Sequence, residues 1–169
     1  MSGRVFLDCN VLVYCDDPRD PRKQVRALGV LAELSEDARA VISTQVLQEY
    51  FSAVTRKGRV PAEVARARVA LFAQLEVVLI RPDLVLGAID LHRLHHISFW
   101  DALIVRCAFA AGCDRVLTED MNHGQVIDGV RIENPFLAAA ARAQEGRATW
   151  QPARHKRTER RRGAKTKVE

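Results

Sequence analysis

Short apolar segments alternate with amphipathic helical segments along most of this chain. Strands that alternate with helices form a parallel sheet, and right-handed crossovers between them place helices on both of its faces. The sequence therefore predicts an α/β protein, a doubly wound α/β/α sandwich with a five-stranded parallel sheet. The five expected strands are Arg4–Leu7, Ala40–Ile42, Val77–Ile80, Arg115–Leu117 and Val130–Ile132.

Proline, serine and aspartate mark the expected helix starts. Asp20 is expected to be an N-cap and Pro21 the first residue of the helix that follows. Asp83 and Ser98 are expected to cap two later helices. Pro135 is expected to start a terminal helix. Apolar residues at helical spacing predict the buried faces. These expected core positions are Val25, Leu28, Leu31 and Leu34, then Val46, Leu47, Tyr50, Phe51 and Val54 between Gln45 and Lys57, and Val64, Leu71 and Leu75 after Pro61.

Charge is concentrated at the C-terminal end. The 169-residue chain has a formal net charge of +5, and residues 151–169 alone carry eight Lys or Arg against two Glu. The rest of the chain is therefore close to neutral. A segment with so few large apolar residues buries too little surface to order itself. We expect a folded domain at residues 1–147 and a basic, disordered tail at residues 148–169. The tail residues expected to bind nucleic acid are Arg154, Lys156, Arg157, Arg160, Arg161 and Arg162.

Nothing in the sequence indicates secretion or a membrane. The four cysteines form no CxxC pair, and no basic segment followed by an apolar one opens the chain. The longest apolar stretch, Ala102–Ala111, is interrupted by Arg106 and is too short to span a bilayer. We expect a reduced, cytoplasmic protein.

Four acidic residues are expected at one edge of the sheet, just past the carboxyl ends of strands. Ligands of open α/β sheets bind at this edge. Because converging carboxylates repel one another, such a cluster is tolerated mainly where a divalent cation neutralises it. Carboxylate-bound Mg²⁺ is typical of phosphate chemistry, so the pattern predicts a metal-dependent nuclease. The four residues are Asp8, Glu49, Asp101 and Asp120.

Each of these residues also has an ordinary structural interpretation. Asp8 could be the N-cap of a helix that starts near Asn10, and Glu49 could be a solvated helix glutamate. Ser98 to Asp101 matches a capping box, and Asp120 could be a turn aspartate. Four such coincidences at one sheet edge are improbable, which favours a shared site.

The chain resembles PIN-domain ribonucleases, most closely the VapC-type toxins of bacterial toxin–antitoxin pairs. The resemblance covers about Val5 to Phe136 and rests on four segments: FLDCNVLVY, STQVLQEYFSAVTRK, ISFWDALIVRCAFAAGC and VLTEDMNHGQVIDGVRIENPF. The basic tail departs from the family pattern. The resemblance implies a Rossmann-like fold, a Mg²⁺-dependent endoribonuclease, a cognate antitoxin, and a homodimer. It also implies that Asp8, Glu49, Asp101 and Asp120 form the acidic site, supported by Asn10, Ser43 and Thr118.

The expected chemistry is hydrolysis of RNA by a metal-activated water, with tRNA or rRNA among the possible substrates. Asp8 and Asp101 are expected to bind Mg²⁺, or Mn²⁺ in its place, directly. Glu49 and Asp120 would complete a second metal site or orient the water. An inhibitory partner would insert Arg or Lys among the carboxylates and lay a helix into a groove around Leu28, Leu31, Val46 and Phe51.

Weaker patterns and rival functions remain open. His92, His95 and His96 have helical spacing, but a structural role is favoured over a metal site. A loop-stabilising hydrogen bond is expected for His123, and core packing is expected for Phe99 and Trp100. Cys9 lacks a partner histidine for nucleophilic catalysis. The rivals are a non-catalytic nucleic-acid-binding module, a housekeeping RNA-processing nuclease, and a phosphotransfer enzyme that uses Asp8.

Overall fold

A computed structural model describes residues 3–56 and 60–137 of the chain. The expected basic tail, its six nucleic-acid-binding residues and the domain boundary at residue 147 lie outside these ranges. So do Lys57 and Gly58, where the helix of residues 45–57 was expected to end, and nearly all of the helix expected after Pro135. Within the described ranges, no helix is both long enough and apolar enough to cross a bilayer.

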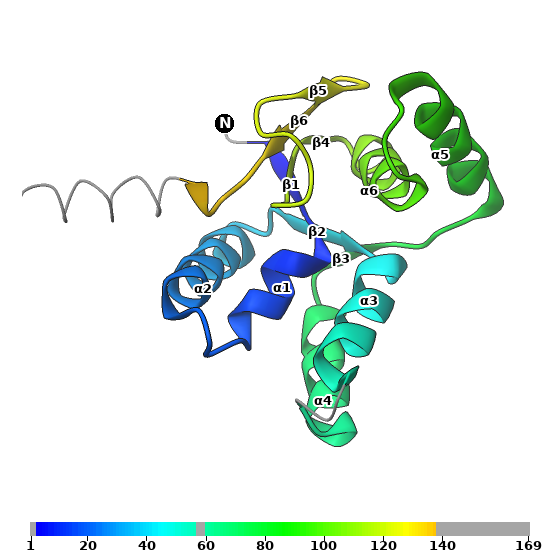
Figure 1. Cartoon of the computed structure of the whole chain (residues 1–169). Helices are drawn as coiled ribbons and strands as arrows, with labels where there is room; N and C mark the ends of the chain where they lie inside the picture. The colour runs from blue at the N-terminus through cyan, green and yellow to red at the C-terminus, as the bar shows by residue number, and fades with distance from the viewer. Residues whose placement is uncertain (1–2, 57–59, 138–169) are drawn as a thin grey trace, which may run out of the picture.

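The described residues form a six-stranded sheet in the order β3-β2-β1-β4-β6-β5 (Figure 1). Five strands are parallel, which confirms the predicted five-stranded parallel sheet. A sixth, β5, pairs antiparallel with β6 at the edge. The strands are β1 (Arg4–Leu7), β2 (Ala40–Ser43), β3 (Glu76–Val78), β4 (Cys113–Leu117), β5 (Val126–Ile127) and β6 (Val130–Glu133).

Strand β5 was not predicted from the sequence, because it has only two residues. It pairs with β6 through Ile127 and Val130, so Asp128 and Gly129 form the connecting turn. Both turn residues have positive φ, 53° and 82° respectively. Tight hairpins of this kind favour Asp-Gly, because their backbone twist matches the twist of the paired strands.

The described residues also form six helices, with α1 and α2 on the opposite side of the sheet from α5 and α6 (Figure 1). This arrangement confirms the predicted layers. Helices α3 and α4 pack against each other below the β2–β3 side of the sheet in the same view. The helices are α1 (Cys9–Cys15), α2 (Pro21–Glu36), α3 (Thr44–Thr55), α4 (Ala62–Phe72), α5 (Pro82–His95) and α6 (Phe99–Ala110).

Side-chain hydrogen bonds fix several helix starts. Asp20 caps α2 by accepting a hydrogen bond from the Lys23 amide, and Ser98 caps α6, as the sequence predicted. The prediction for Asp83 is wrong. Pro82 opens α5, so Arg81 is the N-cap and Asp83 lies in the first turn, where it pairs with Arg81. An acidic residue in the first turn still interacts favourably with the helix dipole.

The predicted apolar face of α2 is partly wrong. Leu34 is buried as expected, but Val25 and Leu28 are 71% and 47% exposed. The buried residues are instead Ala27, Val30 and Leu34. Steps of three residues drift around a helix of 3.6 residues per turn, so a run of such steps cannot stay on one face.

Two other helices depart from their predicted faces in a similar way. In α3 the buried apolar residues Val46, Tyr50 and Val54 repeat every four residues, while Phe51 is 39% exposed. In α4 the buried residues are Ala65 and Phe72. Their sequence neighbours Val64 and Leu71, which the sequence analysis assigned to the core, are about half exposed.

Candidate active site

The site lies where the connectivity of the sheet reverses direction. From β1 the chain moves outward to β2 and β3, then returns across the sheet to β4 on the other side of β1. Strands β1 and β4 are therefore neighbours whose following loops leave in different directions. Ligands of open α/β sheets bind in the crevice at such a switch point. Asp8 follows β1 and Thr118 follows β4, so the sequence places both residues there.

Asp8 is the buried carboxylate of the site, with only 6% of its surface exposed. Its Oδ1 accepts a hydrogen bond from the Cys9 backbone amide at 2.6 Å, which makes Asp8 the N-cap of α1. Its Oδ2 accepts a hydrogen bond from the Thr118 hydroxyl at 2.7 Å. The capping role that the sequence offered as an alternative is therefore present, together with a contact to a second strand.

The amide group of Asn10 connects the ends of both strands. Its Nδ2 lies 3.1 Å from Asp8 Oδ2, 2.9 Å from Thr118 Oγ1 and 3.0 Å from Asp120 Oδ2. The Thr118 hydroxyl oxygen also accepts a hydrogen bond from the Asp120 backbone amide. Asp8, Asn10, Thr118 and Asp120 thus form one hydrogen-bonded group. Asn10 Oδ1 is buried and lacks a hydrogen-bond partner among the described residues.

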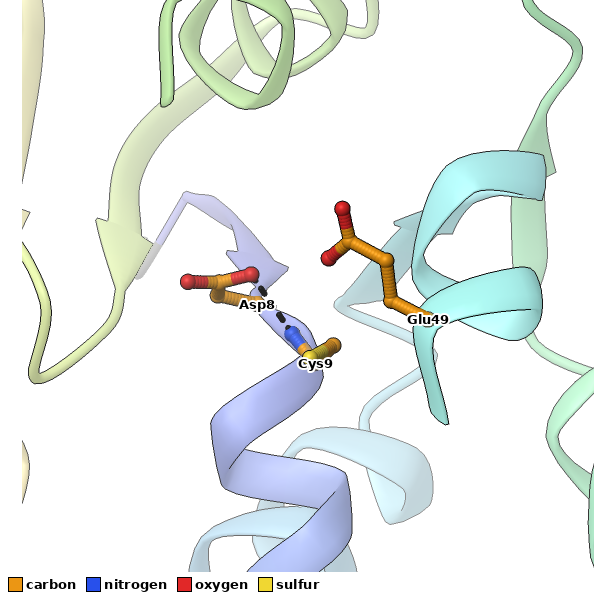
Figure 2. A group of neighbouring side chains, drawn as sticks. All are labelled: Asp8, Cys9 and Glu49. Atoms are coloured by element: carbon orange, nitrogen blue, oxygen red, sulfur yellow. Dashed lines mark hydrogen bonds between the residues drawn. The ribbon is translucent and has the colours of Figure 1, made fainter. Parts of the chain in front are cut away.

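Glu49 reaches this group from α3. Figure 2 shows its carboxylate pointing from α3 toward Asp8 and Cys9. One ligand atom from each of Asp8, Cys9 and Glu49 lies within 4.8 Å of the others. The side-chain amide of Gln45, one helical turn before Glu49, donates a hydrogen bond to Glu49 Oε1 at 2.9 Å and thereby orients it.

Burial and charge change the acidity of Asp8. The pKa of Asp8 is raised to about 6: burial raises it most, the nearby Asp120 and Glu49 carboxylates also raise it, and hydrogen bonds from Thr118 and Cys9 offset part of the rise. The ionised form is thus disfavoured in the protein without a cation. Since a bound cation would favour the ionised form, this environment fits a cation-binding role.

The loop that carries Asp120 is anchored by its neighbour Glu119. The Glu119 carboxylate accepts hydrogen bonds from the Tyr14 hydroxyl and from Lys23 Nζ, each at 2.5 Å. Lys23 Nζ also donates to the Tyr14 hydroxyl at 2.8 Å. Helices α1 and α2 therefore hold the β4 loop in place between Thr118 and Asp120.

Two residues of the expected set have other contacts. Asp101 accepts a hydrogen bond from the Ser98 hydroxyl at 2.7 Å, and its backbone amide donates to Ser98 Oγ, so it stands in the cap of α6. It does not belong to the three-residue ligand group of Asp8, Cys9 and Glu49. Ser43 is fully buried, and its hydroxyl caps α3 through the Val46 amide.

Four residues around the site were not predicted from the sequence: Gln45, Tyr14, Lys23 and Glu119. Glu119 adjoins Asp120 in the sequence, and Gln45 lies one helical turn before Glu49, so their proximity could have been anticipated. The partners of Glu119 could not, because Tyr14 and Lys23 are 105 and 96 residues away.

The expectations for the aromatic and histidine residues have mixed outcomes. His123 Nδ1 accepts a hydrogen bond from the Asn134 amide, which confirms its loop-stabilising role. His92 Nδ1 contacts the Ile97 carbonyl, a structural contact at the end of α5. Phe99 packs against the core, but Trp100 is 59% exposed, so the prediction that both are core residues is wrong for Trp100.

The donors present fit a hard divalent cation. Carboxylate oxygens from Asp8, Glu49 and Asp120 are the ligand type that Mg²⁺ prefers. The Cys9 thiol is a soft ligand, and burial together with the adjacent Asp8 and Glu49 carboxylates raises its pKa far above the ordinary value. Cys9 therefore stays protonated at neutral pH, a form that is a poor ligand for Mg²⁺ and a poor nucleophile.

Fold and site together define a three-layer α/β protein with a carboxylate cluster at its topological switch point. A family model of the PIN domain matches residues 5–128, which include Asp8, Glu49, Asp101 and Asp120. The chain belongs to the PIN domain family. Among curated proteins, no sequence matches significantly.

Solved structures of toxins have a similar fold. The structure of VapC20 from Mycobacterium tuberculosis, a Sarcin-Ricin loop cleaving toxin, matches at a TM-score of 0.57 and 23% identity, covering 69% of this chain and 91% of that one. A toxin–antitoxin complex from Klebsiella pneumoniae matches at 0.56 and 19%, covering 78% and 97%. VapBC2 from Rickettsia felis, bound to a DNA fragment from its promoter, matches at 0.58 and 20%, covering 77% and 97%.

The raised pKa of Asp8 predicts a pH-dependent stability of the metal-free protein. The folded-state pKa of about 6 exceeds the ordinary value of 3.8, so the folded state binds the proton more tightly. Its stabilising contribution is complete below about pH 4 and is lost as pH rises through 6, by roughly 3 kcal/mol at 1.36 kcal/mol per pKa unit.

Urea unfolding in EDTA should show this decline in wild type and not in Asp8→Asn. Exposed Asp90→Asn is the control, and parallel profiles for wild type and Asp8→Asn would contradict the assignment.

Proposed function

We propose that this protein is a Mg²⁺-dependent endoribonuclease and the toxin of a toxin–antitoxin pair. The observation that carries the proposal is the hydrogen-bonded group of Asp8, Asn10 and Asp120 at the switch point, with the Glu49 carboxylate facing it. Membership of the PIN domain family and the fold shared with toxin structures support it. Mg²⁺, or Mn²⁺ as a substitute, is the proposed cofactor.

In the proposed mechanism, Asp8, Glu49 and Asp120 would hold the cation, and Asp101, at the start of α6, remains a proposed further ligand. When bound, the cation polarises the phosphodiester and makes water more acidic. Thr118 and Asn10 orient the Asp8 carboxylate, and Gln45 orients Glu49. Glu49 and Asp120 can accept a proton from the attacking water. Attack by water rather than by the 2′-hydroxyl leaves a 5′-phosphate and a 3′-hydroxyl.

Substitution of the carboxylates should separate catalysis from simple RNA binding. Asp8→Asn, Glu49→Gln and Asp120→Asn each remove a charge with little change of shape. We expect each to lower kcat by about 100-fold or more, since even partners that only orient ligands contribute about 10- to 100-fold. Asn10→Ala should fall within that smaller range. The measurement is cleavage of total RNA in Mg²⁺, with the ends sequenced.

Two controls accompany this experiment. Asp90→Asn changes an exposed carboxylate of α5 and should cleave as wild type does. EDTA should abolish cleavage, and added Mg²⁺ or Mn²⁺ should restore it. Asp101→Asn tests whether the cap residue of α6 also serves the reaction. If wild type binds RNA but never cleaves it, the protein is a nucleic-acid-binding module instead.

We further propose that the basic tail binds the RNA backbone. The proposed residues are Arg154, Lys156, Arg157, Arg160, Arg161 and Arg162. Each phosphate neutralised on a single strand contributes about −0.7 to the slope of log affinity against log salt. Truncation after Trp150 should therefore weaken RNA binding and flatten this slope, while cleavage of a short substrate continues. An unchanged slope would show that the tail does not contact RNA.

An antitoxin partner is proposed on electrostatic grounds. The cluster of Asp8, Glu49 and Asp120 creates a negative potential that an inserted Arg or Lys of the partner can neutralise. The groove expected from the sequence needs correction, because Val46 is fully buried whereas Leu28 and Phe51 are partly exposed. A cavity of about 260 Å³ lies between α1 and α3, with Val13, Ala53 and Val54 in its lining. Apolar side chains of a partner helix can enter it.

Expression of the chain alone should arrest the growth of a bacterial host, and co-expression of the small gene next to its own should restore growth. Asp8→Asn should not arrest growth, because toxicity requires cleavage. Sedimentation of the purified protein tests the proposed homodimer. Normal growth despite a soluble, RNA-cleaving protein would indicate a housekeeping nuclease.

A further inference from the structure

Trp100 exposes an aromatic ring beside the candidate site. It is the second residue of α6, and 59% of its surface is exposed. The ring of the neighbouring Phe99 packs edge-on against it, with 5.2 Å between ring centroids. Phe99 is partly buried against the core, so its contact holds the exposed indole in place. A single exposed apolar residue is ordinary, so the surroundings of Trp100 decide its meaning.

These surroundings form a cavity of about 350 Å³ between two helix starts. Thr44, Gln45 and Gln48 of α3 contribute polar groups, while Phe99, Trp100 and Leu103 of α6 contribute apolar surface. Small-molecule sites commonly have volumes of about 300–1,000 Å³ and combine apolar walls with a few polar groups. The lining thus suits a flat, aromatic ligand with hydrogen-bonding edges.

One side chain connects this cavity with the carboxylates. The amide nitrogen of Gln45 donates a hydrogen bond to Glu49 Oε1 at 2.9 Å and lies 3.5 Å from the Trp100 carbonyl oxygen. Gln45 is 3% exposed, so this connection is internal to the protein. Asp101 follows Trp100 directly. A ligand in the cavity would therefore lie next to a phosphodiester held at the carboxylates.

We propose that this cavity binds an unpaired base of the RNA substrate, stacked on Trp100, next to the bond that is cut. The inference rests on the proposed ribonuclease function and names the part of the substrate that the site contacts. Bases in single strands offer both a π-face for stacking and a Watson–Crick edge for hydrogen bonds, whereas in a duplex the faces are stacked and these edges are paired. The hydroxyl of Thr44 and the amide of Gln48 can bond to base edges.

Trp100 fluorescence gives a direct test. Trp100 and Trp150 are the two tryptophans of the chain, so Trp150→Phe leaves Trp100 as the sole reporter. In EDTA, where cleavage is excluded, an oligouridylate or oligoadenylate should quench this fluorescence. The same backbone with abasic positions should not. A stacked base contributes enough that Trp100→Ala should weaken binding about 5- to 150-fold, and Trp100→Phe should retain most of the affinity.

Two comparisons make this test specific to stacking. Phe109→Ala removes an exposed aromatic at the other end of α6 and should bind RNA as wild type does. Trp100→Ala should leave the salt slope unchanged, because stacking releases no counterions.

Equal affinity of Trp100→Ala and wild type, or the absence of quenching, would overturn the proposal. If Trp100→Ala dissociates a dimer without changing the RNA affinity, the proposal is wrong and Trp100 contacts a second copy of the chain instead. Quenching by RNA without any cleavage in Mg²⁺ would leave base binding standing and refute the nuclease function instead.

Discussion

Two carboxylates that repel each other share one amide group at the candidate site. Asn10 Nδ2 lies within 3.1 Å of both Asp8 and Asp120, which follow different strands of the sheet. An isolated buried carboxylate is unfavourable, and a second one nearby increases the cost. The hydrogen bonds from Asn10, Thr118 and Cys9 offset part of this cost. The part of the cost that these bonds do not offset raises the pKa of Asp8. A bound cation would stabilise the ionised carboxylate.

The surrounding fold makes this unfavourable arrangement possible. Val5, Phe6 and Leu7 of β1 are fully buried, and each of the four residues of β1 has a partner in β4. Burial of such residues contributes about 1.5–3 kcal/mol each, so the three together exceed the cost of one perturbed carboxyl group. The bonds of Glu119 to Tyr14 and Lys23 then fix the loop after β4. The paired strands and this anchor together fix the relative positions of Asp8, Asn10, Thr118 and Asp120.

The sequence predicted features that depend on local chemistry better than those that depend on tertiary packing. The caps formed by Asp20 and Ser98 follow from side chains within three residues of the amides that they bind. The buried faces of α2 and α4 do not follow from local chemistry. Small residues such as Ala27 and Ala65 lie where these helices approach other elements closely, and their larger neighbours are exposed to solvent. For the site, Asp8 and Asp120 could be placed at one edge by topology alone. The contact of Gln45 with both α3 and α6 depends on how two helices pack, which spacing does not reveal.

The acidic site also raises the question of how a polyanion approaches it. Phosphates are repelled by Asp8, Glu49 and Asp120 unless a cation intervenes, so contacts to the backbone near the site contribute little affinity on their own. Stacking of a base on Trp100 does not depend on the charge of the phosphate. Trp100 is connected to Glu49 through a single side chain, that of Gln45. The proposed cationic tail would supply attraction at a distance, and it would do so without regard to sequence. Affinity, position and chemistry would then come from three separate parts of the chain: the tail, the aromatic cavity and the carboxylates. Under this division, the carboxylates can remain close enough to repel one another because none of them has to attract the RNA.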